Sequence, residues 1–240
     1  MNLSQAEEYF KKYHEKLIWE TQNTRAHLEL WERLERYKSS HLKELNQAPH
    51  FFTFTIKAHL DDALLTLSRI VDRRLRHDPL SIWKFLNFVE QNYDMFSTEA
   101  FCQRMMQKPN YDEHWTKSHE PITIKEINED RQRLTSLENV ISNIEKWRDK
   151  VIAHIDLKVV TRNKVISKEY PLKLQQLQEV IDTLFRILNR YSSAFESTSY
   201  TEQFVGEDDI QYVIGAISFK IQERRKQLEI LKKQARDGGV

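Results

Sequence analysis

The sequence predicts an all-α fold, a bundle of helices with additional helices at both ends of the chain. Only four glycines and five prolines occur in 240 residues, which is little material for the turns of a many-stranded β fold. Apolar residues recur at spacings of three and four over most of the chain, which is the period of an amphipathic helix. A chain of this length can bury one large core, so we expect a single helical domain over residues 1–240.

The first two predicted helices are separated by Pro49. Ser4 and Glu7 have the spacing of a capping box, and the apolar residues that follow predict a helix from 4 to about 46, with a break left open near residues 21–24. We interpret residues 1–47 as an N-terminal extension. After Pro49, an apolar stripe from Phe52 to Val71 predicts a core helix.

The central part of the chain contains two further helix starts. Asp78 and Pro79 have the pairing of an N-cap residue with proline at the first helical position, so a shorter helix should follow them. Residues 105–121 lack a period and are expected to be a loop. Thr123 and Glu126 then form a capping box, and one long helix is predicted over about 124–155.

The last third of the chain predicts two helices. Residues 156–170 lose the helical period and are expected to be irregular or a minor hairpin. Helix resumes after Pro171, and a C-terminal helix is predicted over about 207–236.

Composition favours a protein of the cytoplasm. The single cysteine, Cys102, cannot form an internal disulfide, and we interpret it as a small buried apolar residue. No stretch reaches the roughly 20 apolar residues of a membrane span, and the charged N-terminus is unlike a signal peptide. Because 37 Lys and Arg nearly balance 36 Asp and Glu, any binding of nucleic acid must use a local basic patch.

One segment combines residues suited to cleaving RNA without a metal. Within WRDKVIAHID, His154 follows Arg148 by six positions. Histidine titrates near neutral pH and can move protons, whereas the guanidinium stays charged and matches phosphate oxygens. On a straight helix six residues advance about 9 Å and turn about 120° off the face. A shared site is therefore easier to build between two chains.

This segment resembles the R-x(4 to 6)-H signature of HEPN domains. Together with ALLTLSRIVDRRLRHDPLSIWKFL at 63–86, it resembles the AbiU-type abortive-infection branch of that superfamily, with a HEPN-like core over about 50–196. The resemblance implies a helical homodimer in which two such motifs form a metal-independent endoribonuclease site. It also implies an RNA substrate, a role in phage defence or as a toxin, and an antitoxin or other defence-system partner protein.

The resemblance assigns roles to individual residues. His154 would be the acid and base, and Arg148 the phosphate clamp, the two catalytic residues. Asp149, Lys150 and Asp156 would support them, Asp149 by orienting Arg148 or the RNA-facing network. Related toxins carry tyrosine two positions after the histidine, where this chain has Asp156, so control by modification of that tyrosine is not expected.

A structural interpretation of the same motif stays open. Arg148 could form an ordinary ion pair, and His154 could bond a neighbouring carboxylate such as Asp156. The protein would then be a noncatalytic HEPN-like subunit that binds RNA or a partner.

Four other groups of residues bear on RNA, metal or partner binding. Arg69, Arg73 and Arg74, with Arg76 and His77, end a helix and could guide RNA, and Trp147 could stack on a base. Asp112, Glu113, His114, His119 and Glu120 lack a fixed metal-ligand spacing, so no metal and no cofactor is expected. The basic C-terminal stretch KIQERRKQLEILKKQAR is interpreted as a solvated helix end, with RNA, a partner helix or acidic lipid as alternatives.

Overall fold

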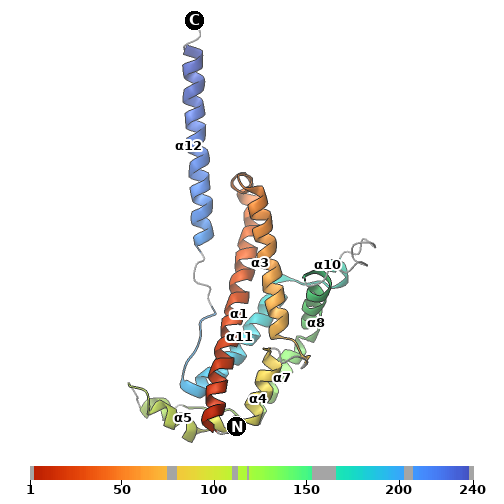
Figure 1. Cartoon of the computed structure of the whole chain (residues 1–240), viewed down its shortest axis with the longest axis vertical. Coiled ribbons are helices and arrows are strands. Elements are labelled where there is room, and N and C mark those ends of the chain that lie inside the picture. Colours follow the sequence, from red (N-terminus) through yellow and green to blue (C-terminus); the bar gives the residue numbers. More distant parts are fainter. Residues whose placement is uncertain are drawn as a thin grey trace. The chain divides into compact units, whose positions relative to one another are not determined.

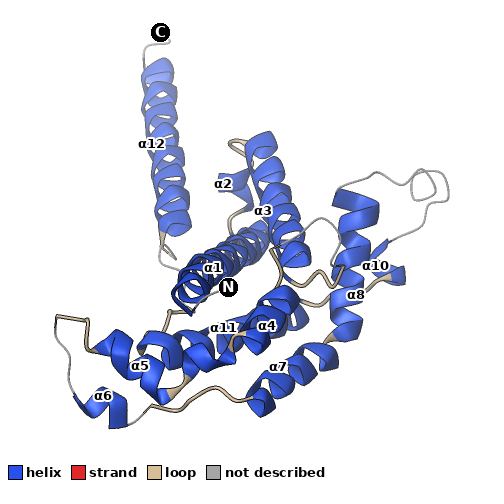
Figure 2. Ribbon diagram, turned by 60° about the horizontal axis from the view of Figure 1, so that its bottom comes forward, coloured by secondary structure: helices blue, strands red, loops and turns tan. Residues whose placement is uncertain are grey.

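The computed structural model describes residues 3–74, 80–109, 113–117, 119–152, 166–202 and 208–237. These residues form helices and no β-strand, which confirms the all-α prediction (Figures 1 and 2). The helices are α1 Leu3–Ser40, α2 Leu42–Leu45, α3 Pro49–Ile70, α4 Ile82–Gln91, α5 Thr98–Met105, α6 Glu113–Lys117, α7 Ile124–Ser136, α8 Glu138–Trp147, α10 Ile166–Glu169, α11 Leu174–Glu196 and α12 Asp209–Asp237, with a 3₁₀ turn η1 at Tyr93–Phe96 and a π-helical turn η2 at Arg148–Ile152.

The chain divides into two compact units. The first contains residues 1–25 and 61–203, and the second contains residues 26–60 and 204–240. Helices α1 and α3 each contribute residues to both units. The single-domain expectation, with residues 1–47 as an N-terminal extension, stays a prediction; in the structure residues 1–25 group with residues 61–203.

Helix α11 forms the centre of the first unit. It contacts η1, α5, α7 and α8, and its buried face carries Phe185, Tyr191 and Phe195. Phe10 of α1 packs against Phe195 with ring centroids 4.5 Å apart. Phe10 also packs on Phe85 of α4. These aromatic contacts explain why the first turns of α1 belong to this core.

The second unit has a smaller core. Leu34 of α1, Leu45 of α2, Phe52 and Ile56 of α3 and Ile214 of α12 are buried together. The side chain of Ser218 donates a hydrogen bond to the carboxylate of Glu44 at 2.7 Å, which fixes α12 against α2.

Several helix boundaries differ from the predictions. No break occurs near 21–24: α1 is continuous there, although the hydroxyls of Thr21 and Thr24 donate to carbonyls four residues earlier. The Ser4 and Glu7 capping box is absent, since α1 begins at Leu3 and Glu7 instead pairs with Arg104.

The long helix expected over 124–155 is divided into α7, α8 and the turn η2 as far as residue 152, and residues 153–155 lie outside the described residues. The capping box of Thr123 and Glu126 is present and starts α7, but the helix stops at Ser136. There the hydroxyls of Thr135 and Ser136 donate to Arg131 and Arg133 carbonyls, an arrangement that bends helices.

The remaining boundary differences are small. Asp78 and Pro79 lie outside the described residues, and Ser81 is the N-cap of α4, its hydroxyl accepting from the amide of Lys84. The expected loop at 105–121 contains the short helix α6. The expected helices after Pro171 and near 207 are confirmed as α11 and α12.

No described helix is long and apolar enough to cross a membrane.

Candidate functional site

The predicted site begins where α8 passes into the π-helical turn η2. The indole Nε1 of Trp147 donates to the carbonyl of Tyr170 at 2.8 Å, and the Nζ of Lys150 donates to the Tyr170 hydroxyl at 2.8 Å. Tyr170 therefore holds the residues on both sides of Arg148 and Asp149. Turns of the π type are frequent at functional sites, because they change the direction in which successive side chains point.

Arg148 is fixed by two carboxylates. Its Nε donates to Asp149 Oδ1 at 2.7 Å, and its Nη1 donates to Asp72 Oδ2 at 3.1 Å. Only 12% of its side chain is exposed. A planar guanidinium held through two nitrogens has a defined orientation.

Asp72 joins Arg148 to the segment after α3. Its Oδ1 accepts from the backbone amide of Arg74 at 2.8 Å and from Arg74 Nε at 3.1 Å. Arg74 Nη1 also lies 3.7 Å from Asp149 Oδ2. The four residues Asp72, Arg74, Arg148 and Asp149 thus form a closed ring of ion pairs, the Asp72 cluster, and the hydrogen bond to Asp72 raises the pKa of Arg74.

Sequence reasoning missed Asp72. Arg69, Arg73 and Arg74, on either side of it, indicate only a basic helix end. An acidic residue beside the C-terminus of a helix is, however, disfavoured by the helix dipole. In RIVDRR, Asp72 has this unfavourable position and is followed by two arginines. This pattern indicates a carboxylate that is stabilised by neighbouring cations.

Glu145 adds negative charge next to this cluster. Burial raises its pKa, and the nearby carboxylates of Asp72 and Asp149 raise it further, while Arg74 opposes them. Among the described residues, Glu145 therefore adds a third carboxylate to those of Asp72 and Asp149.

The other predicted RNA-binding residues separate into distinct places. Arg74 is in the Asp72 cluster. Arg73 pairs with Glu138 and lies over the ring of Trp83, 4.1 Å from its centroid. Arg69 is exposed on α3, and its Nη2 donates to the hydroxyl of Thr66 at 3.0 Å.

The two remaining predicted site residues, His154 and Asp156, lie outside the described residues, as do Arg76 and His77 of the basic helix end.

Among the residues considered as metal ligands, His119 is held by other contacts. The ring of His119 stacks on Phe101, and its Nε2 lies 2.9 Å from the carbonyl of Ala194. Burial lowers the pKa of His119. Within the described ranges no group of three or more His, Cys, Asp or Glu is placed to hold a metal ion, and Asp112 is outside those ranges.

Most of the chain is similar to a known family. The family model described as AbiU2, of the HEPN type, matches residues 5–214. No curated protein and no solved structure matches the chain. The matched span runs from residue 5, in α1, through α11 and includes the whole Asp72 cluster and the RDKVIAH segment.

Proposed function

The chain belongs to the AbiU2 family of HEPN proteins, and on this premise we propose that it is a metal-independent endoribonuclease acting in the cytoplasm, in phage defence or as a toxin. The observation that carries the proposal is the fixed orientation of Arg148 by Asp72 and Asp149 at the start of the RDKVIAH segment. A cation that is oriented before the reaction stabilises developing charge without reorganisation.

The proposed reaction requires a group that transfers protons and a cation that binds the phosphate. A base removes the proton of the ribose 2′-hydroxyl, and the 2′-oxygen forms a bond to phosphorus. The bond between phosphorus and the 5′-oxygen breaks, and an acid protonates that oxygen, leaving a 2′,3′-cyclic phosphate and a 5′-hydroxyl. We assign proton transfer to His154, because imidazole titrates near neutral pH. Arg148 would bind the non-bridging phosphate oxygens.

A phosphate must compete with carboxylates for Arg148. Its Nε and Nη1 are bound to Asp149 and Asp72, so a phosphate would use the remaining nitrogen or replace one carboxylate. Asp149 is the one to be replaced, because 44% of its side chain is exposed against 14% for Asp72. Asp72 would then keep Arg148 oriented while RNA is bound.

The proposal includes a homodimer. Arg148 of one protomer and His154 of the other would form each of two equivalent sites across a twofold axis. Lys150 and Asp156 would support them, and Arg69, Arg73 and Arg74 would contribute positive charge along the RNA path. Trp147 uses its N–H for Tyr170, so a contact with a base would be made by its ring face.

A second function is favoured by one observation. Arg148 is mostly buried and neutralised by two carboxylates, which is also what a structural arginine would show. In that case the chain is a noncatalytic HEPN-like subunit that binds RNA or a defence-system partner.

The deciding experiment is cleavage of mixed transfer, messenger and ribosomal RNA by the full chain in excess EDTA. Arg148→Ala and His154→Ala are compared with wild type, and Lys146→Ala is the matched control, because Lys146 is exposed on the same helix. We expect wild type and control to produce 2′,3′-cyclic phosphate ends, and the two site variants to lose about 100-fold or more in rate.

Folding and self-association of every variant are checked by circular dichroism and sedimentation. RNA binding by wild type without cleavage of any substrate would favour the noncatalytic subunit. Full activity in folded Arg148→Ala would contradict the proposed site.

A further inference from the structure

Helix α12 continues beyond the part of the chain that packs in the second unit. Its first turns contribute the buried Ile214 and the half-buried Ile210 and Ile217 to the core with α2 and α3. The family match ends at residue 214, whereas α12 ends at Asp237 (Figure 1). Most of this helix is therefore outside the matched fold.

The apolar stripe of α12 does not end with that core. Ile214, Ile217, Ile221, Leu228 and Leu231 follow one another at spacings of three, four, seven and three residues, and Arg224 occupies the intervening position on the same face. Leu228 and Leu231 are 49% and 59% exposed. An apolar face that continues on an exposed helix is typical of a surface that binds another helix.

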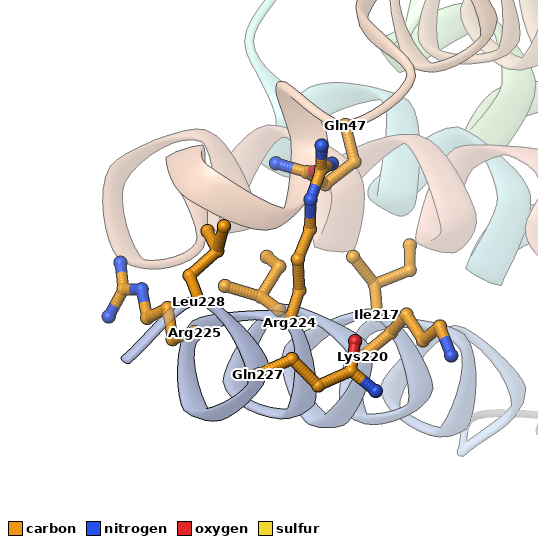
Figure 3. A pocket seen from close by; sticks show the side chains of 8 residues that line it. Gln47, Ile217, Lys220, Arg224, Arg225, Gln227 and Leu228 are labelled. Carbon is orange, nitrogen blue, oxygen red and sulfur yellow. The ribbon is translucent and has the colours of Figure 1, made fainter. Parts of the chain in front are cut away.

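A groove lies along this stripe. It has a volume of about 610 Å³, and Ile217, Ile221 and Leu228 supply its apolar lining. The charged residues that line it are Lys220, Arg224 and Arg225, and no acidic residue is among the lining residues (Figure 3). Figure 3 shows Arg224 extending across the groove from α12 toward Gln47, in the turn between α2 and α3.

The charge of α12 indicates which kind of molecule can bind in the groove. Residues 218–236 contain seven Lys or Arg and two Glu. In a second copy of α12, the same basic residues would face Lys220, Arg225 and Lys232 at the edges of the stripe, and like charges there oppose pairing. RNA would satisfy the positive charge but not the isoleucine and leucine side chains.

We propose that α12, from Ser218 onward, is the docking site for an amphipathic helix of a partner protein that carries leucine-like residues on its inner face and Asp or Glu at both edges. The apolar residues of that helix bury Ile221, Leu228 and Leu231, and its carboxylates pair with Lys220, Arg225 and Lys232. Arg224 lies inside the stripe, so it requires a carboxylate or a polar partner and fixes the register of the two helices.

The test uses the full chain and two designed, fluorescently labelled peptides of about four heptads. Both carry leucine at the inner positions, and they differ only in having Glu or Lys at the edge positions. Fluorescence anisotropy should show that the Glu peptide binds at least about tenfold more tightly than the Lys peptide, with an affinity that falls as salt is added.

Two variants of similar exposure locate the binding face. Leu228→Asp alters the groove, whereas Ile230→Asp alters a residue of similar exposure, 58% against 49%, that lies about 200° away around the helix. The first should reduce affinity for the Glu peptide about tenfold or more, and the second should leave it unchanged. Helicity measured by circular dichroism is compared for both, since each introduces the same residue into α12.

Three results would overturn the proposal. One is equal binding of the two peptides or no binding of either. Another is a wild-type dimer in sedimentation that Leu228→Asp dissociates, because the occupant would then be a second copy of the chain. The last is displacement of the Glu peptide by an RNA oligonucleotide at stoichiometric concentration, which would assign the groove to RNA.

Discussion

Asp72 and Asp130 each bind two arginines, yet their surroundings differ. Asp130, on α7, accepts from Arg133 Nη1 at 2.8 Å and lies 3.2 Å from Arg190 Nη1 of α11. Its side chain is completely buried, while both arginines reach the surface. Around Asp72 burial is shared: the side chains of Asp72 and Arg148 are both mostly buried, whereas the outer residues Arg74 and Asp149 are exposed.

This difference distinguishes an ion pair whose carboxylate is closed to water, at Asp130, from a cluster whose outer residues are open to solvent. Burial raises the pKa of Asp130 although both arginines lower it, which is the mark of a carboxylate with no access to water. Removing one side of such a pair leaves charge unpaired in the core. In the Asp72 cluster, by contrast, the Asp149 carboxylate is 44% exposed, which is why we propose it as the group that a phosphate replaces.

The largest effect on stability is expected at the buried aspartate. Asp130→Ala should lower the free energy of unfolding by about 3 kcal/mol, the lower part of the range for broken buried pairs, because Arg133 and Arg190 can turn toward water. Urea denaturation followed by circular dichroism measures this. A loss below about 1 kcal/mol would place Asp130 with ordinary surface pairs.

Replacing Asp72 should reduce activity more than stability, in contrast to replacing Asp130, which should mainly reduce stability. Asp72→Ala is expected to cost only about 1–2 kcal/mol of stability, but to reduce RNA cleavage about 100-fold, since Arg148 loses its orientation. Lowered kcat with little change in KM would mark a positioning role. If Asp72→Ala unfolds the protein as readily as Asp130→Ala, the two clusters do not differ as described.

The anchor on Tyr170 should have a moderate effect. Trp147→Phe keeps most of the ring but removes the N–H that binds the Tyr170 carbonyl, so the free energy of unfolding should fall by about 1 kcal/mol. Thermal unfolding of this variant beside wild type tests the value, and an unchanged midpoint would show that the hydrogen bond does not hold η2.

The smallest effect is expected from Glu145, with a defined pH dependence. Because its pKa in the folded protein is raised above 4.5, it favours folding most below that pH and loses this contribution as pH rises through the raised pKa. Glu145→Gln should therefore be more stable than wild type at pH 7, with the difference shrinking toward pH 4. A difference that grows on acidification would contradict the cause assigned to the shift.

The helical architecture was predictable because period and capping are local. The T-x-x-E box at Thr123 and the stripes of α3, α11 and α12 follow from neighbouring residues alone. The end of α7 at Ser136 was not predictable, since apolar spacing continues through Leu137 and Ile141 while hydroxyl back-bonding bends the backbone.

The site was predictable only in part. The motif singled out Arg148 and Asp149, which share a hydrogen bond, and the orienting role expected of Asp149 stays a prediction. The part played by Asp72 depends on a contact spanning 76 residues, which no spacing rule reveals. The contacts of Arg73 with Glu138 and with the ring of Trp83 likewise join residues that are distant in sequence, or on different elements, and no local pattern predicts them.

The most direct test of the composite site mixes two inactive variants. Arg148→Ala and His154→Ala chains are each prepared alone, then mixed in equal amounts under conditions that allow exchange of protomers, and RNA cleavage is measured in EDTA. If each site takes Arg148 from one chain and His154 from the other, about half of the dimers contain one intact site, and about a quarter of wild-type activity returns. No recovery in mixtures that form mixed dimers would contradict a site shared between protomers.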